Sequence, residues 1–283
     1  MRKLQKKMLV LPLKRICIYV MSIIVILFFV FPLFWQISSS LKPPGELYKM
    51  PLVWVPTKPY FLRYLNVLRG TPILSGLRNS FIVAFITTII NLFLGSLCAY
   101  SISRIRIPGR RVIMRLILIL SLLPGITILV PMYQVMVSLR LLNTYAALII
   151  IYTGTSLPFA VWFLVNYFKT IPDELEDAAL IDGCTYTQVL YRIFFPIAKP
   201  AMASIGLLCF IGCWNEYLFA VVFTQTEAMR TAPVILDLLQ GLHDVPWGDL
   251  TTAATIMTLP IVILVLFCQK FIVGGLTTGA VKG

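Results

Sequence analysis

The residues best suited to chemistry form an acidic segment between long apolar runs, and the chemistry they suit is the docking of a helix. Thr170, Pro172 and Asp173 predict a helix start, with a hydroxyl cap and a proline in the first turn. Gly183 suits the left-handed residue that ends such a helix. The first half carries the acids Asp173, Glu174, Glu176 and Asp177, and the apolar stripe consists of Leu175, Ala178, Ala179 and Leu180. A helix this short is not stable alone in water, so it needs a groove in a partner.

A second polar group, Trp214 to Tyr217, lies within an apolar run. Glu216 is the ionisable residue deep in that run, where a charge is costly and marks a functional or a packing site. Glu216 shares a helical face with small residues that allow another helix to approach, namely Gly206, Cys209, Cys213 and Ala220. We expect Glu216 to face a helix interface or a water-filled path, and prefer the interface. Asn215 lies well off that face, so we expect it to serve a different neighbour, and Asn215 and Tyr217 are further candidates for a translocation path or an interface.

The sequence lacks the residue patterns that metal binding and ATP hydrolysis would need. None of the six cysteines has zinc-site spacing, and His243 is the only histidine, so we expect neither metal ligands nor disulfides. The phosphate-binding pattern Gly-x-x-x-x-Gly-Lys-Ser/Thr does not occur, so the chain cannot hydrolyse ATP by that route. We therefore expect a non-catalytic chain that holds no cofactor of its own.

The elements that must position these residues are membrane helices. Apolar residues make up 59% of the chain and charged residues 12%, with a mean hydropathy of +0.91. A span needs about 20 mostly apolar residues, and the runs are continuous rather than alternating, which favours helices over a barrel. The predicted fold class is an all-α membrane protein with six transmembrane helices, in the windows 16–37, 81–102, 116–137, 145–165, 202–223 and 253–268.

The distribution of Lys and Arg predicts the orientation of these spans. With the N-terminus inside, sixteen of the 24 basic residues fall on the cytoplasmic side, including Lys14, Arg15 and the cluster 104–115. The net charge of +13 is thus mostly a topology signal, and because spans separate the basic residues, nucleic-acid binding is disfavoured. The first window is too long for a signal peptide and lacks a cleavage site, so we expect a retained anchor.

One membrane domain accounts for the chain. We expect a basic cytoplasmic tail (1–15), a six-helix domain (16–273) with a cytoplasmic loop (166–200), and a cytoplasmic C-terminal tail (274–283). The outer loop 38–80 ends at Asn79-Ser80, which could cap the second span. Kinks are expected in the third span, which contains Pro124, Gly125 and Pro131.

The acidic segment also resembles a motif of the permease subunits of binding-protein-dependent ABC importers. The family pattern is Glu-Ala-Ala, three residues, Gly, nine residues, Ile-x-Leu-Pro. Here Asp177 stands at the glutamate and Phe195 at the leucine, and the spacing matches throughout. The resemblance implies that a separate ATPase is contacted through Glu176, Asp177, Ala178, Ala179, Asp182, Gly183, Ile193 and Pro196.

Further segments look like the maltose-type carbohydrate branch of that family, most of all its shorter second permease. They are 39–42, 214–216, 247–249 and 275–283. The resemblance implies the type I importer permease fold with a cytoplasmic coupling helix. Its partners would be a second permease, an ATPase dimer that holds ATP and Mg, and an external solute-binding protein. The C-terminal residues 275–283 would enter the ATPase dimer interface, and an outer loop would probe the binding protein with Gln240, Gly241, Leu242, His243 and Asp244.

These observations favour a permease subunit of an ATP-driven sugar importer in a prokaryotic cell membrane, with both termini cytoplasmic. The alternative is an ion-coupled secondary transporter in which Glu216 carries a proton. That class usually shows half-chain repeats and several buried ionisable groups, and the sequence has neither. A membrane enzyme would need a catalytic constellation that is absent from the sequence. The sugar itself is left open, since polyol and glycerol phosphate importers resemble the same branch.

Overall fold

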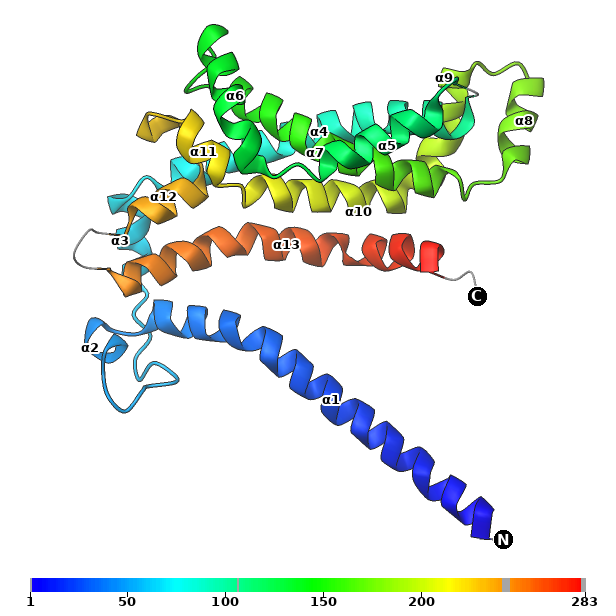
Figure 1. The fold of residues 1–283 in the computed structure, drawn as a ribbon. Helices are drawn as coiled ribbons and strands as arrows, with labels where there is room; N and C mark the ends of the chain where they lie inside the picture. The colour runs from blue at the N-terminus through cyan, green and yellow to red at the C-terminus, as the bar shows by residue number, and fades with distance from the viewer. Residues whose placement is uncertain (1, 106, 241–244, 281–283) are drawn as a thin grey trace. The chain divides into compact units, whose positions relative to one another are not determined.

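The computed structural model describes residues 2–105, 107–240 and 245–280, and every regular element in those ranges is a helix (Figure 1). The long helices are α1 (Arg2–Leu41), α4 (Ile73–Arg104), α7 (Tyr145–Phe168), α10 (Phe195–Trp214) and α13 (Trp247–Ala280). Two shorter helices, α5 (Arg110–Ser121) and α6 (Gly125–Ser138), form a bent pair. The remaining elements are α2 (Pro44–Leu47), α3 (Leu62–Gly70), α8 (Asp173–Ile181), α9 (Tyr186–Val189), η1 (Leu190–Phe194), α11 (Leu218–Phe223), η2 (Glu227–Met229) and α12 (Ala232–Leu238).

Length and composition identify the helices that can cross a membrane. Five qualify alone, and the bent pair makes a sixth if it counts as one span. The five are Arg15–Leu41, Ile73–Arg104, Tyr145–Phe168, Tyr186–Trp214 and Trp247–Lys270. The predicted all-helical fold with six apolar segments is therefore confirmed, while several of the predicted boundaries are wrong.

The third predicted span is not a continuous helix. α5 and α6 meet at 94°, and Pro124 occupies the N-cap of α6 with an extended backbone. Proline has no N–H to donate and disfavours helical angles in the residue before it, so the chain breaks at Leu123. Pro131 lies inside α6 without ending it. The prediction of mere kinks in window 116–137 therefore underestimated Pro124.

The start of the second span lies earlier than predicted. α4 begins at Ile73, so Asn79 and Ser80 lie inside it and do not cap it. Both are buried and bind the segment before α12 instead: Asn79 Nδ2 donates to the carbonyls of Ala228 (2.8 Å) and Arg230 (2.9 Å). Ser80 Oγ accepts a hydrogen bond from the Ala232 N–H at 2.9 Å. At the two ends of the chain, α1 includes most of 1–15 and α13 continues to Ala280.

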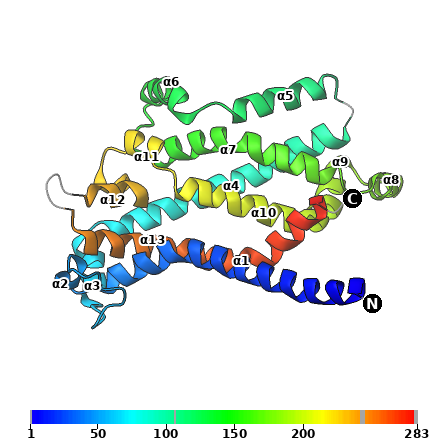
Figure 2. The same ribbon diagram turned by 60° about the horizontal axis from the view of Figure 1, so that its bottom comes forward.

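The described helices group into two compact units. The first contains residues 1–70 and 239–256, and the second contains 71–238 and 257–283. In the second unit α4, α7 and α10 lie side by side (Figure 2). Two apolar clusters fill the space among them. One surrounds Leu164 and Phe194, and the other surrounds Tyr152 and Trp214.

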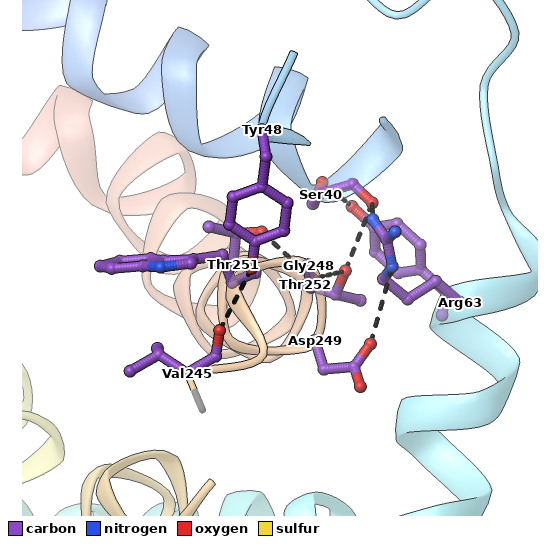
Figure 3. A network of polar contacts seen from close by, with 10 residues as sticks. Ser40, Tyr48, Arg63, Val245, Gly248, Asp249, Thr251 and Thr252 are labelled. Atoms are coloured by element: carbon purple, nitrogen blue, oxygen red, sulfur yellow. Dashed lines mark hydrogen bonds and ion pairs between the residues drawn. The ribbon is translucent and has the colours of Figure 1, made fainter. Parts of the chain in front are cut away.

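A buried arginine organises the first unit (Figure 3). Arg63 Nη1 donates to the Ser40 carbonyl at 3.1 Å, and its Nε lies 3.6 Å from Asp249 Oδ1. The same carbonyl accepts a hydrogen bond from Thr252 Oγ1 at 3.3 Å. A Cβ at Gly248 would lie 2.6 Å from the Arg63 guanidinium carbon, so the close approach requires glycine there. The resemblance-bearing Gly248-Asp249 pair thus closes this network around Arg63.

Candidate functional site

The acidic helix α8 begins at Asp173, with Pro172 at its N-cap and no side-chain cap. The predicted cap at Thr170 is wrong. Thr170 Oγ1 donates to the Tyr167 carbonyl at 2.7 Å, because Thr170 still follows the last turn of α7. Proline ends that turn and presets the backbone for the first turn of α8.

The end of α8 is as predicted. Gly183 has φ +85°, in the left-handed region that favours glycine. Its N–H donates to the Leu180 carbonyl at 3.1 Å, and the Cys184 N–H donates to Ala179 at 3.0 Å. This pair of bonds is the Schellman motif, which satisfies the last carbonyls of the helix and turns the chain toward α9.

Arg104, the last residue of α4, holds the connector in front of α8. Its side chain is 6% exposed. Nη2 donates to the Phe168 carbonyl at 2.7 Å and also to the Ile171 carbonyl, while Nη1 pairs with the exposed Asp173 carboxylate. A buried guanidinium needs such partners, because an unpaired charge inside a protein is expensive. Arg104 therefore fixes where α7 stops and α8 starts.

Glu176 is the second attachment point of α8. It is 7% exposed, and its Oε1 accepts a hydrogen bond of 2.7 Å from the Tyr100 hydroxyl. Its Oε2 lies 3.6 Å from Arg104 Nε. The Phe194 ring packs edge-on against Tyr100 at 5.0 Å and lies 5.0 Å from the Arg104 guanidinium carbon. A single buried cluster thus joins α4, α8 and the segment before α10.

The apolar stripe predicted on α8 divides between two faces. Ala179 is buried and Leu180 packs against the same core, so these two hold α8 to its own chain. Leu175 and Ile181 are 43% and 86% exposed, and Ala178 is exposed between them. Among the acids predicted for coupling, Glu176 points inward, while Asp177 and Asp182 are exposed. The helix therefore presents an outward face that is apolar in the middle and acidic beside it.

The second half of the motif continues into α10. Thr185 and Gln188 form a reciprocal capping box at α9. The next turn, η1, is a π-helix, and the Phe195 N–H donates to the Leu190 carbonyl five residues back. Pro196, which has no N–H, follows directly, so the wider turn occurs where the regular bonding pattern loses a donor. Ile193 is half-buried and Pro196 is exposed.

Glu216 caps a helix instead of lying inside one. α10 ends at Trp214, and the Glu216 carboxylate accepts hydrogen bonds from the N–H groups of Phe219 (2.9 Å) and Ala220 (3.1 Å) in α11. The Tyr152 hydroxyl of α7 donates to it at 2.6 Å. The prediction of one continuous helix over 202–223 is therefore wrong, because this carboxylate stabilises a new helix start.

The two neighbours of Glu216 face elsewhere. Asn215 is exposed, and its N–H donates to the Ile211 carbonyl at 3.1 Å. The exposed Tyr217 hydroxyl donates to Asp237 Oδ2 at 2.7 Å, and this bond to a carboxylate raises the pKa of Tyr217. Of the residues predicted to probe a binding protein, Gln240 is exposed, and Gly241, Leu242, His243 and Asp244 lie outside the described residues.

A small cavity of about 280 Å³ lies beside Glu216. Its lining comes from α7, α10 and the turn after α10: Tyr152, Thr155, Ser156, Phe159, Leu208, Cys209, Gly212, Cys213 and Glu216. Glu216 thus has a helix-capping role and also borders a space between two spans. Sequence reasoning missed Tyr152, as it missed Tyr100 and Arg104. Arg104 could have been found from its place at a span end near the acidic segment, but neither tyrosine stands in a pattern.

In the described residues, several apolar helices could cross a membrane and a short acidic helix lies beyond the end of one of them, which is the architecture of a multi-pass membrane protein. A family described as "Binding-protein-dependent transport system inner membrane component" matches residues 91–277. The chain belongs to this family, and it is a permease subunit of an ABC importer.

Curated relatives cover nearly the whole chain. The trehalose/maltose transport system permease protein MalG of Thermococcus litoralis is 38% identical over 96% of this chain and 98% of its own length. The sulfoquinovosyl glycerol transport system permease protein SmoH of Agrobacterium fabrum is 38% identical over 89% of each chain. The trehalose transport system permease protein SugB of Mycobacterium tuberculosis is 35% identical over 93% of this chain and 96% of its own.

Solved structures share the fold. A bacterial ABC transporter that imports the acidic polysaccharide alginate superposes with a TM-score of 0.80 at 25% identity, covering 91% of this chain and 95% of that one. A chain of the alginate transporter in complex with its pentasaccharide-bound periplasmic protein has a TM-score of 0.67 at 14% identity, covering 89% and 92%. The expected type I importer permease fold is therefore confirmed.

The substitution Tyr100→Phe should loosen α8. It keeps the ring that packs on Phe194 but leaves the buried Glu176 carboxylate without its hydroxyl donor, which costs about 1–3 kcal/mol. We expect a lower melting temperature for the purified complex. The matched control is Tyr191→Phe, since Tyr191 is 41% exposed and its ring also packs on a phenylalanine. Equal melting temperatures for the two variants would contradict this role.

Glu216→Gln should retain substantial ATP-driven uptake, because an amide oxygen can still accept from the α11 N–H groups. Glu216→Leu should destabilise the complex, because it leaves those N–H groups and the Tyr152 hydroxyl unpaired. Both are measured in vesicles supplied with ATP, with and without a protonophore. An assembled but inactive Glu216→Gln complex, together with uptake abolished by the protonophore, would support proton coupling instead.

Proposed function

We propose that this permease forms half of the translocation pathway of a carbohydrate importer and that α8 is its coupling helix. The other half would come from a second permease, and the substrate would arrive on an external solute-binding protein. Support for the substrate class comes from relatives named for trehalose, maltose and sulfoquinovosyl glycerol. ATP and its magnesium ion would be held by an ATPase dimer, and this chain would catalyse no reaction itself.

The proposal that α8 couples to a partner rests on how its two faces differ: one is anchored to the permease and the other is exposed. Its inward face is tied by Glu176 and Ala179 to the end of a membrane span, while Leu175, Ala178 and Ile181 face outward without cover from the described residues. An exposed apolar face on a short, firmly anchored helix fits insertion into a groove of a partner. Movement of that groove would reach α4 through Glu176 and Arg104.

No observation favours the ion-coupled alternative. The Glu216 carboxylate accepts hydrogen bonds from two backbone N–H groups and one hydroxyl, which is the bonding of a structural helix cap. The described residues place no second acid or histidine on the lining of the cavity beside it. A proton relay across a membrane usually needs a chain of such groups.

Gly183→Val should abolish uptake while leaving membrane insertion normal. A β-branched residue is strained at φ +85°, so the Schellman turn would open and α8 would lose its fixed orientation. The measurement is co-purification of the ATPase together with solute uptake. Gly183→Asn is the matched control, because asparagine tolerates left-handed angles and should keep both. Wild-type uptake by the valine variant would remove the support for coupling through α8.

Both termini should be cytoplasmic, as the basic clusters near the span ends indicate. In a background without native cysteines, a cysteine at Lys58 should react with an impermeant thiol reagent added outside. A cysteine at Asp177 should react only after the membrane is opened. Both positions are exposed in the structure, so accessibility within the fold does not limit either reaction. The reverse labelling pattern would refute the proposed orientation.

A further inference from the structure

A strongly basic pocket lies where α4, α5 and α7 meet, and the functions above make no use of it. Its volume is about 530 Å³. The lining residues are Ile102, Ser103, Arg104, Arg110, Arg111, Met114, Arg115, Lys169 and Asp173. Five side chains are thus cationic and one is a carboxylate, and that carboxylate already pairs with Arg104.

Four of the five cations around this pocket have no anionic partner in the described part of the chain. Among the described residues, no ion pair or side-chain hydrogen bond involves Arg110, Arg111, Arg115 or Lys169, and all four are exposed. At the wall of the pocket, the side chain of Arg104 is 6% exposed, yet its Nε donates no hydrogen bond. Like charges gathered without counter-charges repel each other, so an anion in this pocket would be favoured.

The pocket lies where two helices that could cross a membrane come to an end. Arg104 is the last residue of the span in α4, and Lys169 follows the last residue of the span in α7. Span ends coincide with the boundary between hydrocarbon and headgroups. Basic pockets between membrane helices at this level suit anionic lipid headgroups.

The same helix that supplies the arginines also offers an apolar surface below them. After Arg115, α5 turns apolar, with Leu116 and Ile119 53% and 57% exposed. Val112, at helical spacing from both, is 55% exposed. An acyl chain along this stripe would bury it while its phosphate lies among the arginines.

We propose that the pocket between α4, α5 and α7 binds an anionic phospholipid, with the phosphate held by Arg110, Arg111, Arg115 and Lys169 and an acyl chain along α5. Arg104 lines the pocket and also holds the connector before α8, so the bound headgroup would lie next to the residue that anchors the coupling helix. The inference goes beyond import itself and does not depend on the substrate.

The test counts bound lipid by native mass spectrometry of the full chain, purified with the subunits that accompany it. The probes are phosphatidylglycerol, phosphatidylcholine and glycerol phosphate. Wild type should retain phosphatidylglycerol in preference to the other two. Arg110→Gln with Arg111→Gln should weaken its binding about 10- to 30-fold, because each cation near a headgroup contributes about 1 kcal/mol. Lipid count is read without ATPase activity or uptake, so failure of the import proposal would be seen separately.

Two further variants separate charge from folding. Arg110→Lys with Arg111→Lys keeps the charges and should keep most of the phosphatidylglycerol. Arg192→Gln with Lys199→Gln removes two exposed cations outside the pocket and should bind like wild type. Equal binding of phosphatidylcholine, equal binding of glycerol phosphate, or equal loss in the Arg192/Lys199 control would each overturn the proposal. The proposal would also be overturned if the purified complex held no lipid in this pocket because another subunit covers α5.

Discussion

The ion pairing of Arg104 is the constraint on which the coupling end of this permease depends. A guanidinium that is almost fully buried must be neutralised and hydrogen-bonded, or the helix end that carries it would not stay folded. Its partners are the carbonyl of Phe168 at the end of α7, the carbonyl of Ile171 in the connector, and two carboxylates from α8. A charge at the end of one span therefore sets the end of another span and the start of the helix beyond it. Phe194 closes the cluster, so the segment that leads into α10 is fixed by the same group.

Glu216 is likewise an ionisable side chain in an apolar region, and it too is held by hydrogen bonds, although its partners differ from those of Arg104. Its carboxylate has no cationic neighbour among the described residues, and instead it accepts two N–H groups at the start of α11 and the Tyr152 hydroxyl. Helix N-terminal N–H groups carry partial positive charge, which stabilises a carboxylate without a counter-ion. By capping the start of α11, Glu216 thus fixes the place where the helix breaks. That break gives α10 an end at Trp214, beside the cavity that Glu216 borders.

Sequence reasoning succeeded where the signal is local and failed where it depends on tertiary partners. The left-handed Gly183 and the apolar spans could be predicted, because a Schellman turn and a hydropathy window are both local properties. The Thr170 cap failed because Thr170 belongs to the last turn of α7, and the Asn79-Ser80 cap failed because those side chains bind a segment about 150 residues away. The hydropathy windows also predicted α5 with α6, and α10 with α11, as single spans, because composition alone does not reveal a bend in the chain. Tyr100 and Tyr152 belong to no sequence pattern, and only the fold shows that each donates to the carboxylate of a candidate site residue.

The division of α8 into two faces explains why its motif combines acids with small residues. Glu176 and Ala179 lie on one side of the helix, where the carboxylate meets Arg104 and the alanine methyl group leaves room for the core to approach. A larger side chain in place of Ala179 would push α8 away from that core, since the position is 7% exposed. On the other side Ala178 keeps the outward face shallow, so that Leu175 and Ile181 stand out as its two projections. Gly183 then sets the direction in which the chain leaves both faces, because its φ of +85° and the two Schellman bonds fix the turn at the end of α8. The spacing of the motif thus matches the spacing between the buried residues that hold α8, the exposed residues on its other face and the glycine at its end.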